Sequence, residues 1–107
     1  MTPLAYVETG PDGAPLVVFV HGSMDRMAGF AKVARRLESD HRVLRYDRRG
    51  YARSLAVGPP FTIAQHADDL LTLLDGRRAI VLGHSLGGNV VLAAAQRAKP
   101  TPSPPRS

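Results

Sequence analysis

An uninterrupted apolar run near the amino terminus, Leu16–Val20, limits the choice of fold more than any other segment of the sequence. A strand with one face in water alternates apolar and polar residues, whereas a continuous apolar run is typical of a strand buried on both faces. Such strands occur in parallel sheets that are covered by helices. The run ends abruptly at His21 and Gly22. This segment therefore predicts an α/β fold.

Strand-like and helical segments alternate along the rest of the chain. Residues 27–37 and 62–74 carry apolar side chains at helical spacing, and residues 90–98 have a helix-compatible composition. The second of these helices begins with a capping-box pattern, Thr62 followed three residues later by Gln65. Further strands are predicted at residues 4–9, at Arg42–Tyr46 and from Ala79 to Leu82. The repeating order predicts a mostly parallel sheet with helices on both faces.

Length and composition fit one small domain. The chain has 107 residues with 44% hydrophobic and 21% charged residues, which is typical of a protein with a packed core. We expect residues 1–99 to form this domain. Residues 100–107 contain four prolines and no apolar aliphatic residue, so we expect a disordered tail there.

The remaining composition excludes several classes of function. Fourteen Lys and Arg residues face nine Asp and Glu residues, but the arginines are scattered, without a basic run or aromatic platform. We therefore expect a solvated basic surface and no nucleic-acid partner. The absence of Cys excludes disulfides, zinc-thiolate sites and a thiol nucleophile. No run approaches the roughly 20 apolar residues that span a bilayer, so we expect a cytoplasmic protein without a membrane partner.

A glycine-rich segment after the last predicted strand carries the chemistry. Gly83, His84, Ser85, Leu86 and Gly87 match Gly-x-Ser-x-Gly, the nucleophile elbow, in which a sharp strand-to-helix turn exposes a serine hydroxyl. The turn brings strand and helix close together, so side chains at both glycine positions would collide with neighbouring backbone. The pattern alone is weak. Here, however, it follows an apolar strand and opens a helix, which is the context that the motif requires.

Two further segments strengthen this interpretation. Residues 19–23, Phe-Val-His-Gly-Ser, resemble the strand and oxyanion loop of the α/β-hydrolase superfamily. Residues 47–54 resemble the Asp-x-Arg-Gly-x-Gly-x-Ser loop of the same superfamily, with Ala52 where glycine is usual. The resemblance covers roughly residues 4–99. It implies the amino-terminal portion of a serine-nucleophile α/β-hydrolase, a partial fold that lacks the C-terminal strands and the lid.

This resemblance implies acyl transfer to Ser85, with the backbone N–H groups of Ser23 and Leu86 stabilising the oxyanion. The residues that it implies for the geometry of the loop and elbow are His21, Gly22, Gly83, His84 and Gly87. A serine at the elbow argues against epoxide hydrolases and haloalkane dehalogenases, which resemble this chain but place Asp there. No cofactor or metal is implied. The expected substrate is a small ester-like molecule, with ester, thioester, amide and lactone all open.

The partners of a catalytic serine are missing from this sequence. In this fold they follow the nucleophile in the order Ser, then Asp or Glu, then His. Residues 86–107 contain no Asp, no Glu and no His. Neither the acid nor the base can therefore come from its expected place.

Upstream residues do not replace them. His84 adjoins the nucleophile in a tight turn, where neighbouring side chains point apart. By resemblance, His21 holds the geometry of the oxyanion loop. His41 and His66 are expected to be surface or packing residues. Asp47 is expected to fix the loop that follows it by accepting backbone hydrogen bonds.

Three interpretations of this chain follow. We favour a truncated or degraded hydrolase with little or no turnover, because regular patterning stops near Lys99 and gives way to the Pro-rich segment. The second is an active hydrolase completed by a missing C-terminal part or by a second chain. The third is a non-enzymatic binding module on the hydrolase scaffold, which predicts that Ser85→Ala changes no function.

The strand from Ala79 to Leu82 also carries an expectation about association. In the family's strand order, the elbow strand pairs with a strand encoded further on. Without that neighbour it becomes an exposed apolar edge, through which the chain could associate with itself.

Overall fold

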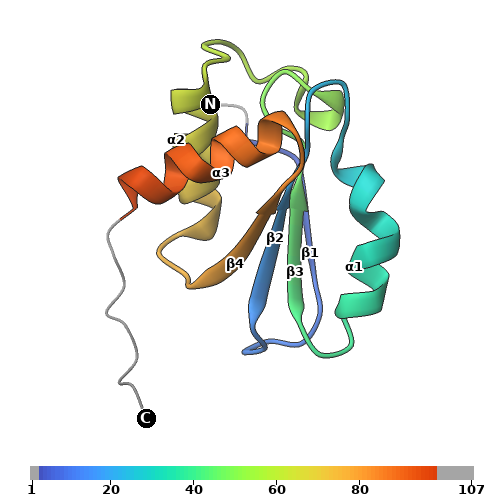
Figure 1. The fold of residues 1–107 in the computed structure, drawn as a ribbon. Helices are drawn as coiled ribbons and strands as arrows, with labels where there is room; N and C mark the ends of the chain where they lie inside the picture. The colour runs from blue at the N-terminus through green and yellow to red at the C-terminus, as the bar shows by residue number, and fades with distance from the viewer. Residues whose placement is uncertain (1–2, 99–107) are drawn as a thin grey trace.

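The computed structural model describes residues 3–98, which form one four-stranded sheet with helices on both faces (Figure 1). The strands are β1 (Tyr6–Thr9), β2 (Leu16–Val20), β3 (Arg42–Tyr46) and β4 (Ala79–Gly83). The α-helices are α1 (Ala31–Leu37), α2 (Ile63–Leu74) and α3 (Leu86–Arg97). Two 3-10 helices, η1 (Met27–Phe30) and η2 (Ala52–Ser54), lie in the connections.

The strands lie in the order β1-β3-β2-β4. Both β3 and β4 run parallel to β2, and only β1, at one edge, is antiparallel to its neighbour β3. This confirms the predicted α/β architecture with a mostly parallel sheet.

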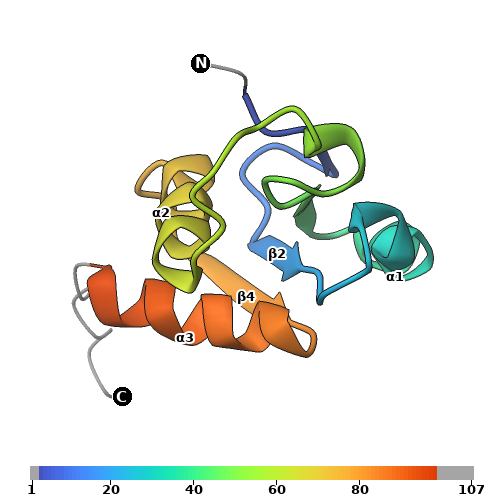
Figure 2. The same ribbon diagram turned by 90° about the horizontal axis from the view of Figure 1, so that it is seen from above.

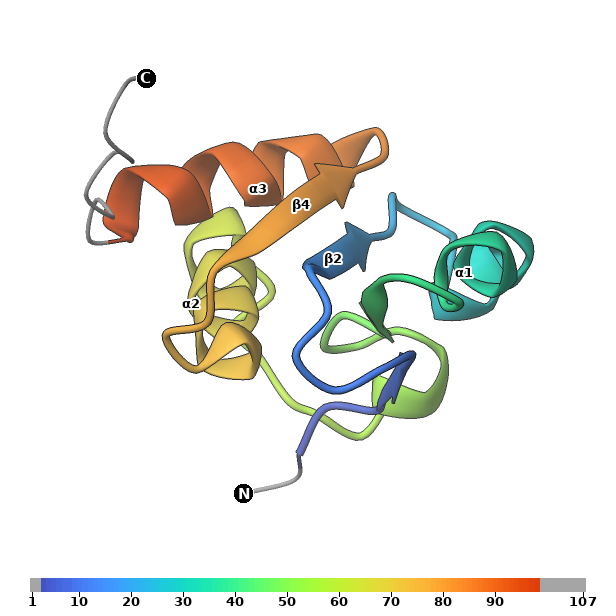
Figure 3. The ribbon, with the colours of Figure 1, turned by 90° about the horizontal axis from the view of Figure 1, so that it is seen from below.

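The central strand β2 is buried along its whole length, as its apolar run predicts. One side of it packs with α2 and α3 in a cluster that includes Val18, Val20, Leu70 and Val90. The other side packs with α1, where Phe19 stacks on Phe30 with ring centroids 4.9 Å apart. Figures 2 and 3 show the same layers end-on, with α1 on one side of the sheet and α2 and α3 on the other.

The expected helix over residues 27–37 is divided into two parts. It begins as the 3-10 helix η1 and becomes α-helical only at Ala31. Side chains three residues apart eclipse in a 3-10 helix, so Met27 and Phe30 project from the same side of the turn. Met27 is buried and Phe30 packs against the cluster under α1, which explains the tighter winding.

Two other elements begin two or more residues away from their predicted starts. The first strand begins at Tyr6 instead of residue 4, because Tyr6 faces Tyr46, the last residue of its partner strand. Helix α3 begins at Leu86, four residues before the predicted start, because its first turn contains two glycines that a composition pattern does not count as helical. The predicted cap of α2 is present, with the Thr62 hydroxyl accepting a hydrogen bond from the Gln65 amide at 3.1 Å.

Within residues 3–98, β4 pairs with β2 and has no second neighbour. Ile80 and Leu82 lie beside Val17 and Phe19 on the α1 side of the sheet, but they extend past the cover of α1 and are 59% and 49% exposed. The predicted apolar edge is therefore present in the structure.

None of the helices formed by residues 3–98 is long and apolar enough to cross a membrane. The tail predicted at residues 100–107 lies outside the described residues, as does the predicted domain boundary at residue 99.

Candidate active site

Ser85 occupies the sharp turn between β4 and α3, at the carboxyl end of the parallel strands. Its backbone has φ 55° and ψ −122°, a conformation that favours glycine and is strained for any other residue. The side chain is exposed and makes no capping hydrogen bond to α3, although serine is a common N-cap residue. The turn therefore presents the hydroxyl to solvent.

Two glycines make this turn possible. A Cβ on Gly83 would lie 2.3 Å from the carbonyl oxygen of Gly87, and a Cβ on Gly87 would lie 2.3 Å from the carbonyl oxygen of Val20. Both contacts are with backbone, which cannot rotate away as a side chain can. The structure thus has the close backbone approach, expected from the motif, that a side chain at either position would block.

A third glycine lets the loop after β2 approach the elbow. A Cβ on Gly22 would lie 2.9 Å from the His84 carbonyl oxygen and 3.0 Å from the Ser85 Cβ. The His84 amide also donates a hydrogen bond to the Val20 carbonyl oxygen at 3.0 Å. The structure therefore brings together two segments that are some sixty residues apart in the sequence.

Two backbone amides near the elbow have no hydrogen-bond acceptor within residues 3–98. In the first turn of α3, the Gly87 and Gly88 amides donate to the carbonyl oxygens of His84 and Ser85, each at 2.9 Å. The amides of Leu86 and Ser23 donate to no acceptor among residues 3–98. The positive end of the α3 dipole lies at Leu86. An oxygen that gains negative charge beside Ser85 would find suitable donors here.

His21 is completely buried, and the neighbouring loops occupy both of its ring nitrogens. Nδ1 lies 2.7 Å from the Gly22 carbonyl oxygen, and Nε2 accepts a hydrogen bond from the Arg48 amide at 2.9 Å. Burial lowers the pKa of His21 below its ordinary value. The imidazole is therefore neutral and engaged, and it is not free to take a proton from Ser85.

The Asp47 carboxylate joins two loops at the end of β3. Its oxygens accept hydrogen bonds from the Met27 amide at 2.8 Å and from the Arg53 amide at 3.1 Å. This confirms the interpretation of Asp47 as a loop-fixing acceptor. In the loop after β3, Ala52 has φ 41°, so the position where the family pattern has glycine retains a left-handed conformation with an alanine.

Arg48 corrects the expectation that the arginines form a solvated surface. Its side chain is 1% exposed, and its Nε donates to the His21 carbonyl oxygen at 3.0 Å. Its guanidinium carbon lies 4.5 Å from the centre of the Tyr51 ring. The next residue, Arg49, pairs with Asp69 at 2.6 Å. This burial could not be predicted from the sequence, because adjacent arginines in a loop are usually both in solvent.

None of the four histidines hydrogen-bonds to Ser85 within the part of the chain that the structure describes. His41 pairs with Asp40 at 2.7 Å, and His66 is buried on α2. His84 is exposed at the elbow. Residues 3–98 contain no group of three His, Cys, Asp or Glu side chains that could hold a metal ion.

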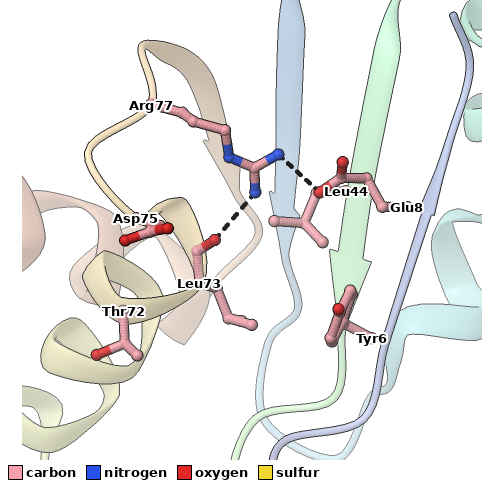
Figure 4. A pocket seen from close by; sticks show the side chains of 7 residues that line it. All are labelled: Tyr6, Glu8, Leu44, Thr72, Leu73, Asp75 and Arg77. Carbon is pink, nitrogen blue, oxygen red and sulfur yellow. Dashed lines mark hydrogen bonds and ion pairs between the residues drawn. The ribbon is translucent and has the colours of Figure 1, made fainter. Parts of the chain in front are cut away.

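An open pocket lies away from this site, beside β1, β3 and the end of α2 (Figure 4). Arg77, which precedes β4, donates to Glu8 at 2.8 Å and to the Leu73 carbonyl oxygen at 3.0 Å. Ser85 follows the opposite end of the same strand. The pocket contains none of the predicted site residues.

Comparisons with known proteins agree with this geometry. The profile of the Alpha/beta hydrolase family matches residues 17–106. Proline iminopeptidase PfmaB from Pestalotiopsis fici is 36% identical over 96 residues, which cover 79% of this chain and 32% of the iminopeptidase. Esterase YbfF from Escherichia coli is 32% identical over 80 residues, which cover 72% of this chain and 31% of the esterase.

A solved structure gives the same result. The enol-lactonase from Burkholderia xenovorans superposes with a TM-score of 0.79 at 35% identity, over 88% of this chain and 38% of the lactonase. The chain thus spans about a third of the length of the curated relatives that it matches.

Proposed function

Because the chain belongs to the alpha/beta hydrolase family, we propose that Ser85 is the nucleophile of an acyl-transfer reaction on a small ester-like molecule. The observation that carries this proposal is the Ser85 backbone, held at φ 55° while its hydroxyl stays exposed and caps nothing. Strain of this kind costs about 1–3 kcal/mol and concentrates at functional sites. The packing around Gly83 and Gly87 maintains it.

The proposed reaction begins when Ser85 Oγ attacks the carbonyl carbon of the substrate. The carbonyl oxygen then becomes negatively charged, and we assign its stabilisation to the amides of Ser23 and Leu86. Preorganised donors of this kind stabilise a transition state without reorganising during the reaction. The α3 dipole adds to the effect at Leu86.

The attacking hydroxyl also has to lose its proton. Residues 86–107 contain no Asp, Glu or His, and both nitrogens of His21 are engaged. We therefore propose that these 107 residues alone acylate Ser85 slowly or not at all. A base supplied from outside the sequence is expected to accelerate the reaction.

A chemical-rescue experiment tests this proposal. A fluorophosphonate probe is incubated with the chain in the presence and absence of added imidazole, and the labelled residue is identified by mass spectrometry. We expect slow labelling that imidazole accelerates, and none at this position in Ser85→Ala. Ser23→Ala is the matched control, because it removes another exposed serine hydroxyl but keeps the backbone amide.

Two outcomes would contradict the proposal. Rapid stoichiometric labelling without imidazole would mean that the chain already contains a base. No imidazole-dependent labelling of Ser85 would favour a binding module that keeps the scaffold without the reaction.

We propose no narrower class of substrate than a small ester-like molecule. The relatives named above are an iminopeptidase, an esterase and an enol-lactonase, and their names imply different leaving groups. The attack on a carbonyl carbon is compatible with all three.

We also propose that the chain associates with itself along β4. The support is the unpaired edge of this strand within residues 3–98, together with the exposed side chains of Ile80 and Leu82. Sedimentation velocity is expected to show an oligomer that Leu82→Lys converts to a monomer, because lysine discourages pairing at sheet edges. Leu92→Lys is the control, since Leu92 is 66% exposed but lies on α3. A monomeric wild-type chain would refute this.

A further inference from the structure

We propose that Arg48 is a positioning residue that fixes the direction of the Ser23 amide through His21. The inference rests on the proposed function, in which Ser23 donates to the oxyanion. Arg48 lies at the end of β3 and His21 at the end of β2, the neighbouring parallel strand. The contacts between these two residues control one peptide unit of the loop.

That peptide unit joins Gly22 to Ser23. The C=O of Gly22 and the N–H of Ser23 belong to the same trans peptide, so they point in opposite directions. The hydrogen bond between His21 Nδ1 and the Gly22 carbonyl oxygen, 2.7 Å long, draws the carbonyl toward the buried ring. The Ser23 N–H must then point away from the ring.

The Arg48 backbone sets the tautomer of His21 that this contact requires. An amide N–H can only donate, so the Arg48 amide at 2.9 Å from Nε2 requires a lone pair on that nitrogen. In a neutral imidazole the proton is then on Nδ1. Nδ1 can therefore donate to the Gly22 carbonyl oxygen.

The Arg48 side chain holds the same histidine from another direction. Its Nε donates to the His21 carbonyl oxygen at 3.0 Å. The successive carbonyl groups of His21 and Gly22 therefore both accept hydrogen bonds within this cluster. The Tyr51 ring completes the cluster, 4.5 Å from the guanidinium carbon and 5.0 Å from the His21 ring, which it meets edge-on. The loop thus has little freedom to turn its peptides.

The way in which Arg48 is buried indicates that its role is not to stabilise the core. Both terminal nitrogens of its guanidinium are buried without a hydrogen-bond partner among residues 3–98. A buried charge with incomplete pairing contributes little to stability, and an apolar replacement of similar size is often neutral or stabilising. Arg48→Met is therefore expected to keep the fold and to loosen the Ser23 peptide.

The test uses the whole 15N-labelled chain, the variant Arg48→Met and the control Arg53→Met, which changes an exposed arginine of the same loop. Imidazole 15N shifts are expected to place the wild-type His21 proton on Nδ1. In Arg48→Met, the Ser23 amide resonance is expected to shift and broaden while the melting temperature does not fall. Loss of an oxyanion donor costs about 100-fold or more, so its partial misalignment is expected to slow imidazole-assisted labelling of Ser85 by about tenfold.

An unchanged Ser23 resonance in Arg48→Met, or a His21 proton on Nε2, would overturn the inference. These NMR results do not depend on activity, so a wild-type chain that fails to label would refute the proposed function alone. If Arg48→Met does not fold, His21→Asn and His21→Gln replace it. Asn can place an amide N–H where Nδ1 lies and is expected to preserve the Ser23 resonance, whereas Gln is expected to shift it. Equal spectra for the two variants would again overturn the inference.

Discussion

Adjacent glycines in the first turn of α3 are expected to respond oppositely to alanine. A Cβ on Gly87 would lie 2.3 Å from the Val20 carbonyl oxygen and 2.8 Å from that of His21, and all of these atoms belong to main chain. A Cβ on Gly88 would meet only the Gly83 carbonyl oxygen, at 3.7 Å, an ordinary van der Waals contact. Gly88→Ala is thus a matched control for Gly87→Ala.

The magnitude follows from the movement that relieves the clash. Helix α3 has to withdraw from β2 by about 1 Å, which forfeits roughly a quarter to a half of the dispersion energy at the surfaces that separate. Overpacking of this kind costs about 1–3 kcal/mol, while alanine gains up to about 1 kcal/mol over glycine in a helix. We expect Gly87→Ala to lose about 2 kcal/mol and Gly88→Ala to gain about 0.5–1 kcal/mol.

Urea unfolding followed by far-UV circular dichroism measures both free energies of unfolding. The difference between the two variants is expected to be close to 3 kcal/mol, which is a large part of the stability of a small domain. Equal stability of the two variants would refute the reasoning, because it would mean that α3 does not approach β2 as closely as the glycines indicate.

Three further changes have defined outcomes. Ala52→Gly is expected to raise the free energy of unfolding by about 0.5 kcal/mol, because it relieves the left-handed conformation at φ 41°. A lower urea midpoint than that of the wild-type chain would contradict this. Burial, followed by the charge of Arg48, lowers the pKa of His66 to about 4. As the pH falls from about 6.5 to 4, the unfolded chain therefore takes up a proton on His66 before the folded chain does. The free energy of unfolding decreases by about 3 kcal/mol over this range, and above about pH 6.5 this contribution is complete. His66→Leu is expected to remove this part of the acid sensitivity in urea titrations at several pH values, and an unchanged pH profile would refute it. Thr62→Ala is expected to cost about 1 kcal/mol through loss of the α2 cap, and Thr62→Ser to cost less, in the same unfolding assay.

The sequence predicted the elements whose patterns are local. Strand β2 needed only its apolar run, and α2 only its apolar face and the cap at Thr62. The 3-10 turn at Met27 was not predicted, because it depends on a contact between Phe30 and Phe19 in another element. Sequence periodicity does not report which distant side chains a turn has to reach.

The candidate site also has features that a local sequence pattern predicts and features that depend on distant contacts. The glycine spacing around Ser85 predicted the close backbone approaches that leave no room for a side chain at Gly83 or Gly87. The roles of Ser85, Ser23 and Leu86 in catalysis stay predictions. The burial of Arg48 depends on how the loop after β3 turns against His21, and no neighbouring residue in the sequence signals that turn.

The pairing of β2 with β4 has a consequence for the order of folding. Val20 pairs with Gly83, so this contact closes a loop of some sixty residues, at an entropic cost of about 4 kcal/mol. The intervening β3 pairs with β2 over a shorter separation in the sequence, which shortens this loop, and we expect that pairing to form earlier. The Ser85 turn can acquire its final conformation only when this long-range register is complete. The rate at which a refolding chain regains that turn should therefore report the end of folding, not its beginning.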